Sequence, residues 1–98
     1  MLVAGFDWDD GNRHKMAKHG LSADIVEGVL RGPLRVAPDQ AHSGTERRYR
    51  AVGRTMQDGR AVFVVFTLRE LDGAVRIRPI SARYMHAKEI RRYEETHS

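Results

Sequence analysis

The stretch Ala61–Leu68 constrains the fold more than any other part of this chain. It is a continuous apolar run rich in β-branched and aromatic side chains, which is typical of a central strand covered on both faces. Turn signals stand on both sides of it, Gln57–Gly59 before and Leu71–Gly73 after. Short turns join antiparallel neighbours, so the second half of the chain is predicted to form a β-meander.

The segment before the first turn, Glu46–Arg54, alternates between two kinds of side chain, as a half-buried strand does. One side carries Tyr49, Ala51 and Gly53, and the other carries Arg48, Arg50 and Arg54, with Val52 as an exception. We therefore expect a strand with one apolar face and one basic face.

The segment Val75–Tyr93 predicts a strand that runs directly into a helix. Apolar and basic residues alternate until Pro79, where the alternation slips, and this predicts a β-bulge at or near the proline. A bulge there keeps four polar side chains on one face: Arg76, Arg78, Ser81 and Arg83. Ala87, Ile90 and Tyr93 then recur at helical spacing, and the polar tail after Tyr93 is expected to fray.

The chain opens with a short predicted strand, Leu2–Trp8. Its two aromatic residues, Phe6 and Trp8, fall on the same face, and aromatic side chains of this size are mostly buried. Both are expected in the core.

A first helix is predicted over Gly11–His19. Asp9 or Asp10 can accept hydrogen bonds from its free amides, and Gly20 suits its C-terminal end. Its inward residues are expected to be Met16 and Ala17.

A second helix follows at once, with Ser22 as its N-cap and Gly32-Pro33 as its stop. Leu21, before the cap, can pack on Val26 in a hydrophobic staple. The buried stripe is predicted to comprise Ile25, Val26, Val29 and Leu30.

Leu34–Val36 adds a short strand and Pro38–Gly44 a polar loop, so the predicted order is β-α-α-β-β-β-β-α. We expect an α+β fold in which a small antiparallel sheet carries two N-terminal helices and a C-terminal helix. Residues 1–98 are expected to form one domain with a modest core.

Composition and charge limit the cellular compartments and the kinds of partner that we expect. The chain has no cysteine, which excludes disulfides and thiolate metal sites, and no apolar run approaches a membrane span or the core of a signal peptide. We expect a soluble, cytoplasmic protein without a membrane partner. Residues 1–45 hold five cations against six carboxylates, whereas residues 46–98 hold twelve against seven. A polyanion is the natural partner of such a basic sheet, although basicity alone does not separate nucleic acid from an acidic protein.

Several kinds of chemistry find no support in the sequence. There is no phosphate-binding P-loop and no dinucleotide fingerprint. Ser81 on a strand is not a nucleophile elbow. No metal site and no cofactor are expected, because the histidines lack the i, i+4 spacing and an accompanying carboxylate cluster. These histidines are His14, His19, His42, His86 and His97.

What remains is a group of cations suited to phosphate: Arg48, Arg50, Arg54, Arg76, Arg78, Arg83, His86 and Lys88. RNA carries its own nucleophile, the 2′-hydroxyl, so cleavage needs only positioning and charge stabilisation. Histidine side chains ordinarily titrate near neutrality, so His86 is the candidate for proton transfer. Glu89 could act as a base or pair with a neighbouring cation, and Tyr84 could stack on a base of the RNA.

Four blocks of the sequence resemble the BrnT-like toxins of bacterial type II toxin–antitoxin systems. They keep the family's order and spacing: Phe6–Asn12, Lys18–Ser22, Glu46–Arg54, and Ile80–Arg83 followed by Glu89 and Tyr93-Glu94. The segment between Trp8 and Lys18 is one residue shorter than in the commonest form, and Asn12 stands where a lysine is frequent.

The resemblance implies a RelE-like fold and a metal-independent ribonuclease that arrests growth by inhibiting translation. It also implies a BrnA-like antitoxin with a ribbon-helix-helix part, a heterotetrameric complex, and contact with operator DNA only through the antitoxin. By position, the candidate catalytic residues are Arg83, His86, Lys88, Arg50 and Glu89. The candidate RNA-binding residues are Arg48, Arg54, Arg76, Arg78, Tyr84, Lys18 and His19. Capping of the first helix is an alternative role for Lys18 and His19.

Two alternatives remain open at this point. The same arginines could form a binding module that grips RNA or an acidic protein without cleaving anything. The basic face could also exist mainly to be covered by an antitoxin, with the complex acting as a corepressor. Salt-sensitive RNA binding without cleavage would distinguish the first of these from an enzyme.

Overall fold

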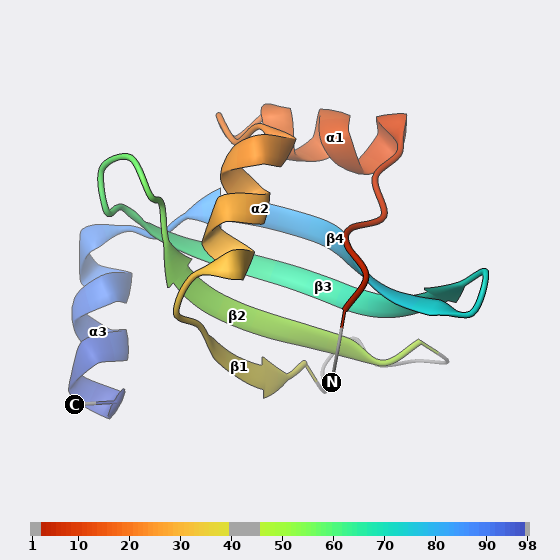
Figure 1. Cartoon of the computed structure of the whole chain (residues 1–98). Coiled ribbons are helices and arrows are strands. Elements are labelled where there is room, and N and C mark those ends of the chain that lie inside the picture. The colour runs from red at the N-terminus through yellow and green to blue at the C-terminus, as the bar shows by residue number, and fades with distance from the viewer. Residues whose placement is uncertain (1–2, 40–45, 98) are drawn as a thin grey trace.

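The computed structural model describes residues 3–39 and 46–97 (Figure 1). The described elements are α1 (Asp10–Ala17), α2 (Ala23–Arg31), β1 (Arg35–Pro38), β2 (Arg48–Arg54), β3 (Ala61–Leu71), β4 (Ala74–Tyr84) and α3 (Ala87–His97). The four strands form one antiparallel sheet in the order β1-β2-β3-β4, which confirms the predicted meander and the α+β class.

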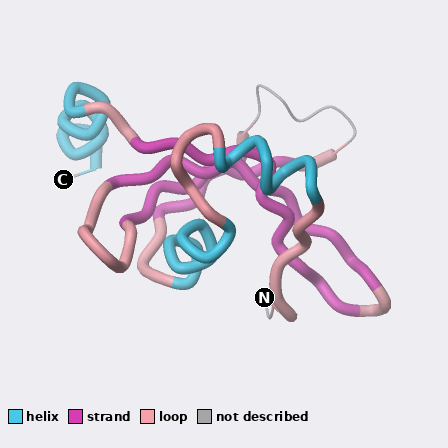
Figure 2. Tube along the Cα trace, turned by 90° about the horizontal axis from the view of Figure 1, so that it is seen from above, coloured by secondary structure: helices cyan, strands magenta, loops and turns pink. Residues whose placement is uncertain are grey.

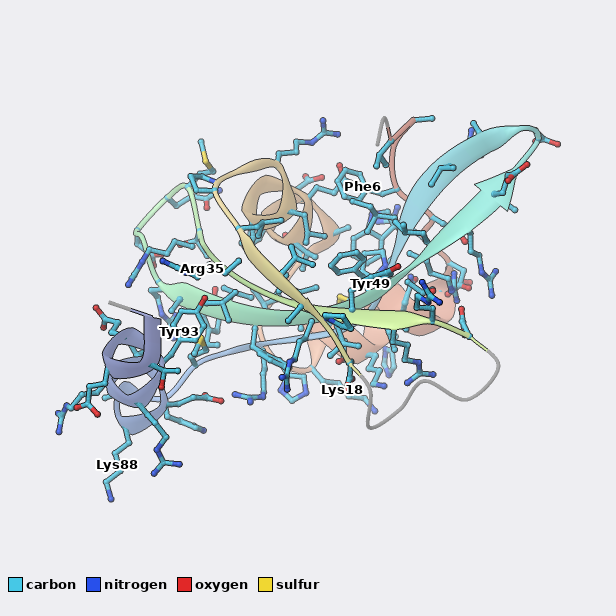
Figure 3. All side chains as sticks on the ribbon, turned by 90° about the horizontal axis from the view of Figure 1, so that it is seen from below. Phe6, Lys18, Arg35, Tyr49, Lys88 and Tyr93 are labelled. Carbon is cyan, nitrogen blue, oxygen red and sulfur yellow. The ribbon has the colours of Figure 1, made fainter. Side chains whose placement is uncertain are left out.

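The helices lie at three different places around the sheet. Figures 1 and 2 show α2 across one face and α1 along the β4 edge. Figures 2 and 3 show α3 on the opposite side of the sheet from α2, at the end where β4 finishes. The sheet therefore has a face covered by a helix and a face that α3 overhangs at one end only.

The core lies between α2 and the sheet. Val26, Val29 and Leu30 of α2 pack with Val62 and Val64 of β3, and all five are buried. The predicted stripe of α2 is thus confirmed, with Ile25 partly buried beside it. Burial of aliphatic side chains of this size contributes about 1.5 to 3 kcal/mol each, so this layer contributes strongly to the stability of the fold.

A glycine in β2 allows α2 to approach the sheet so closely. A Cβ added at Gly53 would lie 2.8 Å from Leu34 Cδ2 and 2.9 Å from Val29 Cγ1. Both distances are well inside van der Waals contact. Any larger residue at this position would push α2 away from the core.

The prediction that β3 is covered on both faces is only partly right. Val62, Val64 and Phe66 are buried on the α2 side, but Phe63 and Val65 on the other side remain partly exposed. None of the described helices crosses the middle of that second face (Figure 2). The unbroken apolar run therefore provides one core face and one partly open apolar surface.

The predicted first strand is wrong for the part of it that the structure describes. Phe6 forms a single parallel bridge with Ile77, and Gly5 beside it has φ +143°, a conformation that breaks a regular strand. The segment still runs along β4, since the amide of Ala4 donates to the carbonyl of Val75 at 2.7 Å. Phe6 and Trp8 pack against the core as partly buried residues.

Helix α1 is held by polar contacts rather than by an apolar stripe. Asp9 is the N-cap in a capping box with Asn12, whose amide nitrogen donates to the carbonyl of Pro79 at 2.9 Å. Asn12 and Met16 are the buried residues of α1, whereas Ala17, which we expected inside, is exposed. The helix ends at Ala17, and Gly20 follows with φ +76°.

The ends of α2 agree with the prediction, whereas the C-terminal tail and the start of the polar loop differ from it. Ser22 caps α2 as predicted, Leu21 and Val26 are both fully buried, and Gly32 ends the helix. The tail after Tyr93 does not fray, because α3 stays helical to His97. Of the predicted loop Pro38–Gly44, Pro38 instead closes β1, and residues 40–45 lie outside the described part.

Candidate functional site

One face of the sheet carries most of the chain's arginines. The strand register places eight of them on the side opposite α2: Arg35, Arg48, Arg50, Arg54, Arg69, Arg76, Arg78 and Arg83. We call this side the arginine face. The predicted bulge makes it possible: Val65 pairs with Ser81 and Phe66 with Pro79, so Ile80 is the extra residue. Without it, Arg83 would point to the core side.

The register also aligns residues in rows across the strands, near the start of α3. Arg35, Val52, Phe63 and Arg83 form one row, and Ala37, Arg50, Val65 and Ser81 form the next. Each row combines cations with apolar side chains. Arg50 and Arg83 are separated by one strand, which is roughly 10 Å across the sheet.

A groove of about 1210 Å³ lies between these rows and α3. We call it the α3 groove. All five candidate catalytic residues line it: Arg50, Arg83, His86, Lys88 and Glu89. Residues from three separate parts of the sequence thus meet in one depression, as expected of a site rather than of scattered surface charge.

Arg83 is held in a fixed orientation by Glu89. Its two terminal nitrogens donate to the two carboxylate oxygens at 2.8 and 2.7 Å. The guanidinium also lies over the ring of Phe63, 5.0 Å from its centroid. A bidentate pair on an aromatic surface fixes the plane of the guanidinium as well as its position.

Glu89 also fixes the start of α3. The backbone amide of His86 donates to a Glu89 carboxylate oxygen at 3.1 Å, and the amide of Ile90 donates to the carbonyl of His86 at 2.9 Å. These bonds, that of the Arg83 guanidinium first, lower the pKa of Glu89 to about 2. The same pair raises the pKa of Arg83. Glu89 is therefore a carboxylate at any physiological pH.

The other groups of the site are open to solvent. Arg50, His86 and Lys88 are exposed. Within the described residues, Arg50 forms no ion pair or side-chain hydrogen bond. Its charge is available to a ligand in the groove.

The far end of the arginine face is different, because carboxylates already occupy it. Arg78 pairs with Asp9 at 2.7 Å and with Asp7 at 3.4 Å, and Arg69 lies 3.6 Å from Asp7. The hydrogen bond that Arg78 donates to Asp9 raises the pKa of Arg78, and the bonds that the Asn12 amide and Arg78 donate lower the pKa of Asp9. A smaller groove of about 670 Å³ at this end is lined in part by Arg48.

The remaining candidates for RNA binding are spread over three places. Arg54 donates to the carbonyl of Gly59 at 2.8 Å, and Arg76 pairs in register with Arg69. Tyr84 lies on the α2 side, packed against the core, with the guanidinium of Arg60 3.6 Å above its ring.

Lys18 and His19 are exposed just after α1, beside the last residue of β4. A Cβ at Gly20, the next residue, would lie 4.0 Å from the ring of Tyr84. Figure 3 shows Lys18 on the side of the sheet where α3 lies. The lysine is thus near the end of β4 that leads into the groove.

Sequence reasoning missed several residues that line the α3 groove. Arg35, Phe63 and Met85 belong to it, as do Arg92 and Tyr93 of α3. Figure 3 shows Arg35 and Tyr93 close together at one end of the sheet. The helical spacing gave a signal for Tyr93. For Phe63 there was none, because an unbroken apolar run does not reveal which side chains face which side.

Among residues 3–39 and 46–97, no group of three or more histidines, cysteines or carboxylates lies close enough together to hold a metal ion. No helix in the described ranges has the length and apolar character needed to cross a bilayer.

Comparison with known families decides what kind of protein this is. A family model described as the ribonuclease toxin BrnT of type II toxin–antitoxin systems matches residues 8–89. The chain belongs to the BrnT family. A comparison with curated proteins gives no match. The resemblance inferred from four sequence blocks is confirmed, and family membership implies an RNA substrate and an antitoxin partner. The match includes the sheet and the Arg83–Glu89 pair but not the rest of α3.

Proposed function

We propose that the α3 groove is the ribonuclease site of this BrnT-family toxin, and that it cleaves RNA through the 2′-hydroxyl without a metal ion. The observation that carries this proposal is that the candidate catalytic residues converge on one groove. Five residues chosen from the sequence as catalytic, on β2, β4 and the start of α3, line the same groove. The family match supplies the reaction class, and the groove supplies cations for the phosphate.

The proposed reaction is an in-line attack. The 2′-oxygen forms a bond to phosphorus as the bond from phosphorus to the 5′-oxygen of the next nucleotide breaks. The products are a 2′,3′-cyclic phosphate and a 5′-hydroxyl. Arg50 and Arg83 bind the phosphate and stabilise the negative charge that develops on its oxygens. Lys88, exposed on the first turn of α3, adds a further cation.

Proton transfer is assigned to His86. Its imidazole is exposed at the mouth of the groove, and histidine is the residue type that most often transfers protons near neutral pH, which suits removal of the 2′-hydroxyl proton or donation to the leaving oxygen. Glu89 is a poor general base at neutral pH, since its pKa is about 2. Its role in the proposal is to orient Arg83 and to fix the start of α3.

The other cations divide by position. Arg54 and Lys18 flank the ends of the strands that lead to the groove, and Arg48 and Arg76 continue the arginine face beyond it. Together they would guide the RNA backbone into the groove. Arg78 and Tyr84 are given structural roles, because carboxylates hold the first and the core holds the second.

The partner in this proposal is a BrnA-like antitoxin with a ribbon-helix-helix part that contacts operator DNA, in a heterotetramer with the toxin in the cytoplasm. The RelE-like character of the fold stays a prediction.

A second function is favoured by one observation. Glu89 already occupies both donating nitrogens of Arg83, so the groove could be a binding surface in which Arg83 is never free for phosphate. In this alternative the chain grips RNA or the antitoxin without cleavage.

The experiment that separates the two is incubation of the purified protein, in EDTA, with 5′-labelled single-stranded RNA, with and without ribosomes. Arg83→Ala is run beside the wild type. Fragments ending in 2′,3′-cyclic phosphate that vanish in the variant are the expected result. Intact RNA with both proteins, in all conditions, would favour the binding surface.

A further inference from the structure

The side chain of Asn12 is buried and joins α1 to the N-terminal segment and to β4. Its amide nitrogen donates to the carbonyl of Asp7 at 3.1 Å and to the carbonyl of Pro79 at 2.9 Å. Its amide oxygen accepts from the backbone amide of Asp9 at 2.8 Å. Both hydrogens of the amide nitrogen are therefore used. A buried polar group with all of these partners is fixed in position, and it fixes the segments that it joins.

The bond from Asn12 to β4 continues a series of hydrogen bonds along the edge of β4 that faces away from β3. Backbone amides of the N-terminal segment donate at this edge to the carbonyl of Val75 at 2.7 Å and to that of Ile77 at 2.8 Å. Carbonyls two residues apart in a strand point to the same edge, so Pro79 is the next acceptor. There the neighbouring segment is α1 (Figure 1), and the side-chain amide of Asn12 replaces the backbone donor.

Pro79 is the last residue of β4 before the β-bulge. The register shift places Ile80 in the strand as an extra residue that has no partner of its own in β3. A bulge disrupts the hydrogen bonds between two strands locally, and proline has no amide hydrogen to donate. The backbone is therefore weakly held by β3 at this point. The bond from Asn12 to the Pro79 carbonyl anchors it from the other edge.

The position of the bulge decides which side of the sheet Arg83 faces. The extra residue reverses the alternation of the side chains that follow it, and this directs Ser81 and Arg83 to the arginine face. Without the bulge, the guanidinium of Arg83 would point to the side of α2, away from the α3 groove. The described lining of that groove begins at Arg35, so α1 contributes nothing to it directly. The contacts that lead from α1 toward the groove run through β4.

We propose that Asn12 is a positioning residue for Arg83. Its bond to the carbonyl of Pro79 holds the bulge at Ile80, and the bulge holds Arg83 over the α3 groove. Without this bond the end of β4 would exchange between two registers, and Arg83 would face the groove in only one of them. The inference rests on the proposed function in one respect, since Arg83 is taken to stabilise the charge that develops on the phosphate.

The test removes the donor with Asn12→Ala and compares it with Asp9→Ala as the matched control. The control removes the other half of the capping box and leaves the bond from Asn12 to Pro79 in place. Asn12→Ala is expected to lower the single-turnover rate of RNA cleavage about ten- to a hundredfold, an effect typical of a misplaced reacting group. Asp9→Ala should stay within about threefold of the wild type per folded molecule. Binding of a non-cleavable 2′-O-methyl RNA should be nearly unchanged in both variants, because the exposed cations remain.

A double-mutant cycle separates positioning from a general loss of stability. In the Arg83→Ala background, Asn12→Ala should cause no further loss of cleavage, because the group through which it acts is already absent. Losses that multiply would overturn the proposal, as would an equal loss in Asp9→Ala or a wild-type rate in folded Asn12→Ala. If Asn12→Ala does not fold, Asn12→Asp carries the test, because a carboxylate keeps the oxygen that accepts from the Asp9 amide but has no hydrogen to donate to Pro79.

The register of β4 is measured by nuclear magnetic resonance, which does not depend on cleavage. Nuclear Overhauser contacts across the strands should pair Val65 with Ser81 in the wild type. In Asn12→Ala a second set that pairs Val65 with Ile80 is expected, with broadened signals from Ile80 to Arg83. A single sharp set in the wild-type register would overturn the proposal. If the wild type does not cleave RNA, the proposed function is wrong, and this measurement still decides whether Asn12 holds the bulge.

Discussion

Arg78 and Arg83 lie on the same strand and the same face, yet their surroundings give them different roles. Arg78 is clamped by Asp7 and Asp9, and its side chain is 19% exposed. Among the described residues Arg83 has a single carboxylate partner, Glu89, and its side chain is 41% exposed over an open groove. An arginine neutralised by two fixed carboxylates holds elements together, whereas one with a single partner at a groove can change partners. Charge on a surface thus indicates function only after its partners are known.

The origin of the difference is the N-terminal segment. Asp7 and Asp9 reach Arg78 because residues 4–7 run along β4 and Asp9 caps α1. At the other end of β4 the chain turns into α3, and the carboxylate that pairs with Arg83 is Glu89 of that helix. One end of the arginine face is therefore built into the fold, and the other remains open to a ligand.

The sharpest test of the comparison removes Arg83. Arg83→Ala is expected to lower RNA cleavage by roughly 100- to 1,000-fold, the loss typical when a group that stabilises developing charge is deleted. Stability should change little, because the pair is partly exposed. Cleavage rates and thermal unfolding measure the two effects. The control is Arg31→Ala, which removes the exposed last residue of α2 and should leave cleavage normal.

The next largest effect is on stability, at the end of the arginine face that the N-terminal segment covers. Asn12→Ala leaves the buried carbonyl of Pro79 without the amide donor and removes half of the capping box. A loss of about 1 to 3 kcal/mol in the free energy of unfolding is expected. Urea unfolding of the variant measures it. A stability equal to that of the wild type would show that α1 is not fixed through this residue.

Arg78→Ala should show the opposite pattern to Arg83→Ala, with a lower stability and nearly unchanged cleavage. Asp9 loses its ion pair with Arg78 and Asp7 keeps only Arg69, so the melting temperature is expected to fall by several degrees. Cleavage per folded molecule should stay within about threefold of the wild type. A loss of activity as large as that of Arg83→Ala would mean that both ends of the arginine face bind the reacting phosphate.

The smallest effect is that of acid on the open end. The pKa of Glu89 is about 2 in the folded chain, below its ordinary value of 4.5. The stabilisation from this carboxylate is therefore complete above about pH 4.5 and is lost as the pH falls toward 2. The protection of the amides at the start of α3 against hydrogen exchange, measured relative to their intrinsic exchange rates at each pH, should fall over this range.

Glu89→Gln should remove that acid dependence, because it cannot titrate. If the variant shows the same loss of protection as the wild type, another group controls the attachment of α3. At neutral pH it should also loosen Arg83, since an amide provides one acceptor oxygen in place of two.

Local patterns in the sequence were sufficient for the elements of the sheet and for the bulge. The alternation in β2 and the slip at Pro79 report side-chain direction residue by residue, so the arginine face could be predicted. The caps Asp9 and Ser22 were predictable because they bond amides three residues away. The prediction of a first strand was wrong because Gly5 interrupts it. The predicted inward face of α1 was wrong in part because Asn12, and not Ala17, is buried beside Met16.

The sequence by itself determined the meander, the family and the list of cations, because these depend on periodicity and on blocks of neighbouring residues. Only the tertiary structure decided which cations are open and which are already neutralised. Arg78 and Asp7 are seventy-one residues apart, and no periodic pattern connects them. The groove likewise depends on where α3 stands relative to β1 and β2. Contacts between distant segments follow from the packing of the whole chain, which local spacing does not encode.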